Sequence, residues 1–321
     1  MRSLLLAGIC ILLCTAARAA TPAEEATKYR ADIDEGVSLL RTGSRDEIHR
    51  SIAKFKSALK SRPESAEAYY WLALAYSDLN NYLRAADNAK DATTYDDRLA
   101  DAWLLWGQVL LYQKDWNEAR IKLETAVHLA PEDPVAAFNL GRAYYHGFKD
   151  PDNALSRFRS AWQHGQATRR DNPEMIALTV RSRLYMGCCE YDRGVRTGNP
   201  TYFDNAINCF LDVVREQPRN LDARLRLALA LRKANRANEC EQMLLGILRE
   251  LETLGPNADR QMLAEVNLNM GDLYLKDALF RDRMRALIYL REFVALMCEG
   301  NHPALDSARE YVAMYDEAVT M

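Results

Sequence analysis

The sequence has no excess of positive charge. Its 42 lysine and arginine residues stand against 45 aspartate and glutamate residues, a formal net charge of -3 over 321 residues. Proteins that bind nucleic acid neutralise phosphates with clustered basic side chains, so this balance argues against nucleic acid as a partner. With 49% hydrophobic residues, the chain has enough apolar material to bury a large core beneath an ordinary charged surface.

The sequence also lacks the motifs that mark a catalytic or cofactor site. It contains no H-E-x-x-H, no C-x-x-C, no Walker loop and no G-x-G-x-x-G, and its five histidines are scattered along the chain. We therefore predict that the protein is not an enzyme and that it uses no cofactor and no metal. An enzyme whose site is assembled from distant residues remains an alternative.

Cysteine is scarce beyond the first twenty residues. Five remain there, at irregular spacing: Cys188, Cys189, Cys209, Cys240 and Cys298. An odd number at such spacing is not a disulfide framework, so we expect these residues to fill small apolar positions. The alternative is a single bridge from Cys188 or Cys189 to Cys209.

One long apolar run is present, at the amino terminus. Met1 and Arg2 precede an apolar stretch over residues 4–13, which is followed by small residues up to Ala19. This pattern is typical of a secretory signal peptide. We predict that residues 1–19 are cleaved and that the mature chain is periplasmic or secreted. The alternatives are an uncleaved anchor or a lipoprotein modified at Cys14 or Cys10, and only then would a membrane be a partner.

Small and apolar residues recur with a period of 34 residues. The reference set is Trp103, Trp106, Gly107, Leu110, Ala119, Leu123, Ala126 and Pro131. A shift of 34 residues back superposes it on Tyr69, Leu72, Ala73, Tyr76, Ala85, Ala89, Ala92 and Asp97. A shift forward gives Ala137, Leu140, Gly141 and Tyr144, after which Ala154, Phe158 and Ala161 follow one residue late.

This pattern resembles the tetratricopeptide repeat (TPR), whose signature is W-x-x-L-G-x-x-Y, then A-x-x-x-F, then A and P. The resemblance implies an all-α fold, a right-handed superhelical α-solenoid in which each repeat is two antiparallel helices, A and B. We expect about seven repeats within residues 20–301 and a capping helix over residues 302–321.

The small residues are explained by close approach of helices A and B. We expect Gly107 to meet Ala119 where the two helices cross, with Leu123 filling the space beside them. Cys240 takes the position equivalent to Ala119.

Proline marks several helix starts. Asp133, Asp150, Asn172 and Asn199 each precede a proline, which predicts a capping side chain before the first helical residue. The glycine-containing segment 191–203 is predicted to be a projecting loop between two helices.

In proteins of this family, partner segments lie in a concave groove lined by the A helices. The resemblance places eight residues of interest there: Tyr70, Trp71, Leu105, Phe138, Asn139, Arg142, Tyr185 and Arg226. His146 and Arg181 also fall at groove positions. For the aromatic residues the alternative is packing between repeats. For the arginines between residues 215 and 236, the alternative is pairing with neighbouring acidic residues such as Glu216, Asp222, Glu239 and Glu241.

These observations predict an exported scaffold that binds one or more proteins and assembles an envelope or transport complex. The alternative is a carrier that holds a small molecule or lipid in the aromatic part of the groove.

Overall fold

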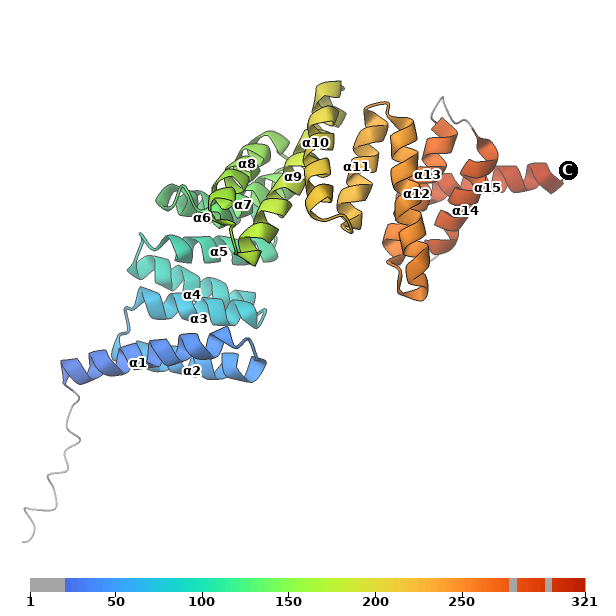
Figure 1. Cartoon of the computed structure of the whole chain (residues 1–321). Helices are drawn as coiled ribbons and strands as arrows, with labels where there is room; N and C mark the ends of the chain where they lie inside the picture. Colours follow the sequence, from blue (N-terminus) through green and yellow to red (C-terminus); the bar gives the residue numbers. More distant parts are fainter. Residues whose placement is uncertain (1–20, 277–281, 298–301, 321) are drawn as a thin grey trace, which may run out of the picture. The chain divides into compact units, whose positions relative to one another are not determined.

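The computed structural model describes residues 21–276, 282–297 and 302–320, and all regular structure within these ranges is helical (Figure 1). The all-α prediction is therefore confirmed. The predicted signal peptide, residues 1–19, and Cys298 lie outside the described residues. The chain divides into two compact units, residues 1–131 and 132–321.

The first unit contains six described helices. They are α1 (Pro22–Arg41), α2 (Arg45–Ser61), α3 (Ala66–Asp78), α4 (Tyr82–Tyr95), α5 (Ala100–Tyr112) and α6 (Trp116–Leu129). Each helix packs on its neighbours in sequence, so that α1–α2, α3–α4 and α5–α6 form pairs and each pair contacts the next. An apolar core extends from α1 to α5 and includes Phe55, Leu72 and Val109.

The second unit follows the same plan. Its described helices are α7 (Pro134–Arg142), α8 (Pro151–Thr168), α9 (Pro173–Thr197), α10 (Pro200–Glu216), α11 (Leu221–Lys233), α12 (Ala237–Leu254), α13 (Arg260–Lys276), α14 (Arg283–Leu296) and α15 (Leu305–Thr320). A π-helical turn, η1 (Ala143–Gly147), continues α7, and a 3-10 turn, η2 (Gly255–Asn257), follows α12. Leu305 and Ala308 of α15 are buried with Leu290 and Phe293 of α14.

Glycine on helix A is matched by a large side chain on helix B. A Cβ atom added to Gly107 would lie 2.5 Å from Cγ of Leu123 and 3.4 Å from the carbonyl oxygen of Ala119. The predicted close approach of the two helices is confirmed, but Leu123 is the nearer neighbour of Gly107. Ala119 itself is fully buried.

The same exchange of volume recurs in other pairs. Gly36, Gly141 and Gly187 lie against the rings of Phe55, Phe158 and Phe210, where an added Cβ would come within 2.5 to 2.7 Å. In the α3–α4 pair, the residues equivalent to Gly107 and Leu123 are Ala73 and Ala89, both with 0% exposure. The two facing residues thus fill the space between the helices together in each pair: glycine faces a large side chain, and alanine faces alanine.

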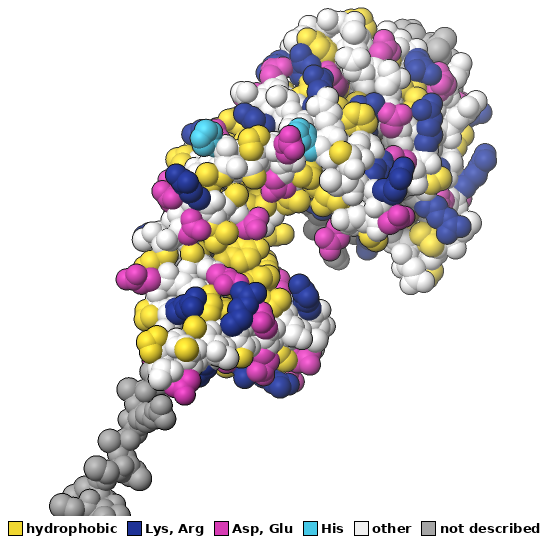
Figure 2. All heavy atoms as spheres, turned by 60° about the vertical axis from the view of Figure 1, so that its left-hand side comes forward, with side chains coloured by type: hydrophobic (Ala, Val, Ile, Leu, Met, Phe, Trp, Pro, Cys, Tyr) yellow, Lys and Arg dark blue, Asp and Glu magenta, His cyan; other side chains and the backbone are white. Residues whose placement is uncertain are grey.

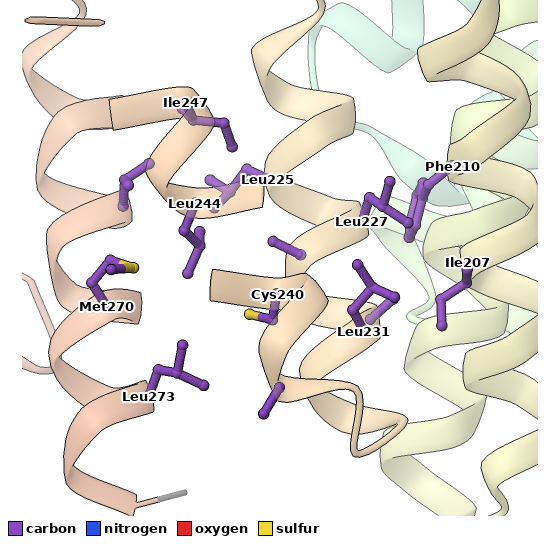
Figure 3. Packing of buried hydrophobic residues seen from close by; sticks show 14 of the residues in the cluster. Ile207, Phe210, Leu225, Leu227, Leu231, Cys240, Leu244, Ile247, Met270 and Leu273 are labelled. Atoms are coloured by element: carbon purple, nitrogen blue, oxygen red, sulfur yellow. The ribbon is translucent and has the colours of Figure 1, made fainter. Parts of the chain in front are cut away.

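Cys240 occupies the predicted small position on α12. It lies among Leu231 of α11, Leu244 of α12 and Met270 of α13, and it has no exposed surface (Figure 3). Cys188, Cys189 and Cys209 are also buried, and none of these three thiols forms a disulfide. The alternative of a bridge from Cys188 or Cys189 to Cys209 is therefore wrong, and burial raises the pKa of Cys188 and of Cys209 to about 11.

The four predicted caps are confirmed. Asp133, Asp150, Asn172 and Asn199 each accept a hydrogen bond from a backbone amide in the first turn of the following helix. Each also precedes a proline that has no amide to donate.

The predicted loop over residues 191–203 is wrong. Residues up to Thr197 extend α9, which therefore has 25 residues, and α10 begins at Pro200. The extension is stable because it also packs. An added Cβ on Gly194 would lie 2.7 Å from the ring of Phe203, so the two helices cross closely there as well.

The η1 turn accounts for the one-residue delay in the repeat. Between α5 and α6, the amide of Asp115 donates to the carbonyl of Leu110, five residues earlier, at 3.0 Å. At the equivalent place the amide of Asp150 donates to the carbonyl of Tyr144, six residues earlier, at 3.1 Å. The extra residue is taken up by the wider π-helical turn.

The surface is mixed in charge. On the face drawn in Figure 2, basic and acidic side chains are interspersed with exposed apolar area, and neither sign dominates. Among the described helices, none combines the length and the apolar character that crossing a bilayer requires.

Candidate interaction surface

Of the predicted groove residues of the first unit, one is buried in the core and two pack against it. Tyr70 packs edge-on against Trp71 with ring centroids 5.2 Å apart, and Trp71 stacks on Phe55 at 6.3 Å. Leu105 is only 5% exposed. Tyr70 and Trp71 are half-buried and keep some accessible surface, whereas Leu105 has almost none to offer a partner.

In the second unit the predicted residues lie close together. Phe138 and Asn139 are 2% and 5% exposed. Phe138 packs against Tyr185 with ring centroids 5.7 Å apart, and the Asn139 side chain donates to the carbonyl of Val135. These two residues are therefore buried and contribute packing. Arg142, Tyr185 and Arg226 are half-buried and keep accessible surface.

Tyr185 is the centre of this arrangement. Its ring stacks on Phe158 at 4.8 Å and meets Tyr145 edge-on at 5.7 Å. Its hydroxyl lies 3.1 Å from Nε2 of His146, a residue of the η1 turn. The tyrosine is therefore held in one orientation by contacts with both its ring and its hydroxyl group.

Three guanidinium groups surround Tyr185. Burial raises the pKa of Tyr185, and the charges of Arg142, Arg181 and Arg226 oppose that rise. Arg226 is neutralised by Asp222, to which its Nε donates at 2.8 Å. We call the set Arg142, His146, Arg181, Tyr185 and Arg226 the Tyr185 surface.

Arg142 and Arg181 differ from Arg226 in their partners. Arg142 donates to the side-chain oxygen of Asn139 at 3.1 Å, and Arg181 lies over the ring of Phe138 at 4.9 Å. Within the described part of the chain, neither forms an ion pair with a carboxylate. The Tyr185 surface therefore presents two positive charges that no carboxylate of the described residues neutralises in an ion pair.

The other arginines of this region are mostly neutralised. Arg224 pairs with Glu250, Arg232 with Asp272, and Arg236 with Glu239. The predicted alternative of local pairing is confirmed for Arg215, Arg224, Arg232 and Arg236, with some partners other than those expected. Among the described residues, Arg219 forms no ion pair. Glu216 instead pairs with Arg169, and Glu241 accepts a hydrogen bond from Tyr274.

A small cavity adjoins the Tyr185 surface. It has a volume of about 120 Å³ and is lined in part by Tyr145, Cys188, Asp192 and Arg226. Burial, and then the neighbouring Cys188, raises the pKa of Tyr145 far above its ordinary value. Within the described ranges no group of three histidine, cysteine or acidic side chains is arranged to hold a metal ion.

Two family models match the chain. The model for the tetratricopeptide repeat matches residues 104–168 and 203–239, and the model for the anaphase-promoting complex, cyclosome, subunit 3, matches residues 51–126. These matches support TPR repeats in the parts of the chain that they cover, in agreement with the helix pairs described above. Proteins of this fold generally serve as non-enzymatic scaffolds for protein–protein interaction.

Solved structures share the fold. The C-terminal part of a TPR protein from Cytophaga hutchinsonii covers 85% of this chain and 99% of its own, with TM-score 0.59 and 14% identity. The pilF protein of Pseudomonas aeruginosa covers 75% and 99%, with TM-score 0.56 and 20% identity. YrrB, a TPR protein with an unusual peptide-binding site, covers 61% and 91%, with TM-score 0.51 and 21% identity. The chain is thus an all-α solenoid of TPR helix pairs.

A curated relative matches part of the chain. Anaphase-promoting complex subunit 3 of Schizosaccharomyces pombe is 25% identical over 166 residues, which is 49% of this chain and 24% of the relative. The chain thus spans about a quarter of the length of that relative.

Proposed function

We propose that this chain is an exported scaffold that binds a carboxylate-bearing segment of a partner protein at the Tyr185 surface. Through that contact it would assemble an envelope or transport complex. The observation that carries the proposal is the pair Arg142 and Arg181, which flank a half-buried tyrosine and have no carboxylate partner among the described residues.

The chemistry of these side chains suits a protein partner. A guanidinium binds a carboxylate through two parallel hydrogen bonds, which gives both affinity and orientation. Arginine and tyrosine are also the residues that most often dominate the energy of an interface. Tyr185 is held by Phe158 and His146 before any partner arrives, so little side-chain entropy is lost on binding.

The similar proteins are consistent with this role. One structural neighbour is described as having a peptide-binding site, and the curated relative is a subunit of a complex. Tyr70 and Trp71 of the first unit form a second half-buried aromatic pair, and we propose that they also contact a partner.

A photo-crosslinking experiment tests the Tyr185 surface. A photoreactive residue at position 184 should capture a partner protein, and Arg142→Gln/Arg181→Gln should reduce the yield about tenfold or more. The matched control, Arg170→Gln/Arg219→Gln, removes the same charge from two exposed sites and should leave the yield unchanged. Equal capture by both double variants would contradict the proposal. A co-purifying small molecule in native mass spectrometry, without any crosslinked protein, would favour the carrier instead.

Export is tested separately. The amino-terminal sequence of the protein recovered from its native cells should begin at Ala20, and the protein should fractionate with the periplasm or the medium. Recovery of an intact Met1 with the membrane fraction would favour an anchor, and an acylated Cys14 or Cys10 would favour a lipoprotein.

A further inference from the structure

A second groove lies in the carboxy-terminal part of the second unit, far along the chain from Tyr185. Helices α12 and α14 both pack on α13 (Figure 1), and side chains of all three line a cavity of about 740 Å³. From α12, the lining residues Glu241, Leu245, Leu248 and Glu252 recur at the spacing of one helical face. We call this the α12–α14 groove.

The middle of the groove is apolar and incompletely covered. Leu245, Leu248 and Leu263 are only partly buried, and Ile288 of α14 is 56% exposed although it lines the cavity. Tyr289 lies beside Ile288 and stacks on Tyr274 with ring centroids 5.8 Å apart and planes 3° from parallel. Binding of a partner that removes this apolar area from water would be favourable in free energy.

Acidic side chains border the apolar floor. Three glutamates and one arginine line the cavity, which gives a net charge of -2. Glu241 accepts a hydrogen bond from Tyr274, whose hydroxyl also lies 3.4 Å from Nη1 of Arg285. Glu252 and Glu292 are exposed, and among the described residues neither forms an ion pair with a lysine or arginine. Arg285 forms its ion pair with Asp282, which lies outside the lining, at 3.3 Å, so the groove as a whole is negative.

The neighbouring groove shows that this pattern is not a general property of the array. Between α10 and α12, a cavity of about 300 Å³ is lined by Arg224, Arg236 and Glu239. Its charges are satisfied internally, since Arg224 pairs with Glu250 and Arg236 with Glu239. Of these two cavities, the α12–α14 groove is the one that combines an exposed apolar floor with acidic side chains that form no ion pair.

We infer that the α12–α14 groove binds an amphipathic helix of a partner protein that bears lysine or arginine beside an apolar stripe. The α12 stripe from Glu241 to Glu252 is about 16 Å long at 1.5 Å per residue, so the groove accommodates about three turns of helix. Apolar side chains of the partner would cover Leu248 and Ile288, and its basic side chains would meet Glu252 and Glu292. This site is opposite in charge to the Tyr185 surface and does not depend on it.

A designed peptide tests the inference on the full mature chain. The probe is a fluorescent three-turn helix with leucine on one face and lysine on the flanks, and the matched peptide carries glutamate in place of lysine. Fluorescence polarisation should show that the lysine peptide binds and that the glutamate peptide binds about tenfold more weakly or not at all. Affinity for the lysine peptide should fall as salt is raised.

Charge-reversal variants locate the site. Glu252→Lys/Glu292→Lys should weaken the lysine peptide about tenfold or more and strengthen the glutamate peptide. Glu64→Lys/Glu310→Lys makes the same change in net charge at two other exposed residues and should have little effect. Ile288→Ser should weaken both peptides, with the thermal unfolding of the variant measured beside it to show that the fold is kept.

Three outcomes would overturn the inference. They are equal binding of the two peptides, equal effects of the two double reversals, and absence of hydrogen-exchange protection in residues 241–252 and 285–292 when the lysine peptide is bound. None of these outcomes bears on capture at the Tyr185 surface, which Arg142→Gln/Arg181→Gln tests independently.

Discussion

At the scale of single residues, the separation between helices A and B is set by complementary volumes. Gly107 leaves room for Leu123, and Ala73 occupies the same position in a pair where the opposing residue is the smaller Ala89. The two solutions fill a similar space with different side chains. Neither residue of a pair can therefore be changed without regard to the other.

Gly107→Ala tests this relation. Its Cβ would lie 2.5 Å from Cγ of Leu123, so the variant should lose about 1–3 kcal/mol of unfolding free energy through overpacking. Leu123→Ala alone should lose about 2–5 kcal/mol through a cavity. The double variant recreates the Ala73 and Ala89 arrangement and should lose less than the sum, by about 0.5–3 kcal/mol. Urea denaturation measures all four proteins, and strict additivity would contradict the volume argument.

His146 confers a dependence on pH. Burial, and then the positive charges of Arg142 and Lys149, lowers the pKa of His146 below its ordinary value of 6.5. Above that value the ring is neutral whether the chain is folded or unfolded. As the pH falls through it, the unfolded chain takes up the proton first, and the folded state loses stability.

His146→Gln should remove that loss. Between about pH 7.5 and about pH 5.5, the wild-type chain should lose more unfolding free energy than the variant, whereas other titrating groups affect both equally. Urea denaturation at the two pH values gives the comparison. Identical losses would show that His146 does not resist protonation in the folded chain.

At the scale of helices, two glycines in the second unit have opposite roles. Gly198 ends α9 in the left-handed conformation, with φ of 72° and no atom within 4 Å of an added Cβ. Gly246 lies inside α12, where an added Cβ would meet only the terminal nitrogen of Arg224, at 3.0 Å. The first position needs glycine for its backbone, and the second does not.

Substitution by alanine should therefore change stability in opposite directions. Gly198→Ala should lose about 1 kcal/mol because alanine is strained at positive φ. Gly246→Ala should gain about 0.5–1 kcal/mol because alanine is the better helix former. Thermal unfolding of the two variants against the wild type makes the comparison. A loss at Gly246 would mean that Arg224 cannot move aside.

The helices were largely predictable from the sequence, because their signals are local. The period of 34 residues located the A and B helices, and Asp133 and Asn199 marked helix starts through capping. The prediction of a loop over residues 191–203 was wrong because glycines favour a loop when only the local sequence is considered. Gly194 instead serves close packing against Phe203, a tertiary contact that no local pattern reveals.

The sequence predicted which face of the A helices carries the candidate site, but not which of its residues are buried. Periodicity placed Phe138, Arg142 and Tyr185 on one side of the A helices, and they do meet there. It could not show that Phe138 would be covered, since coverage depends on neighbours such as Arg181 that come from another repeat. The α12–α14 groove was not predicted, because residues such as Leu248 and Ile288, which form its apolar floor, lie outside the positions that define the period.

At the scale of the whole chain, two units each have a core of their own. Phe55 and Leu72 belong to the core of the first unit, and Leu227 and Leu244 to a core of the second. In a solenoid each helix pair depends mainly on its nearest neighbours. Unfolding is therefore expected to proceed in more than one step.

The distribution of tryptophan makes this expectation measurable. Four of the five tryptophans lie before residue 132, and the fifth is Trp162. In a Trp162→Phe background, fluorescence reports on the first unit alone, whereas far-UV circular dichroism reports on both. The two urea transitions should not coincide, and Gly107→Ala should shift the fluorescence transition more. Superimposable curves would indicate a single cooperative unit.

The π-helical turn after α7 confines a change of length. An added residue in a continuous helix rotates every later side chain by about 100°, which would turn a core face outward. Here Asp150 still caps the next helix, and Phe158 still reaches its glycine. The π-helical turn accommodates the extra residue, and the same turn places His146 beside Tyr185. The extra residue is thus confined to one turn, and α8 keeps both its cap and its close contact with α7.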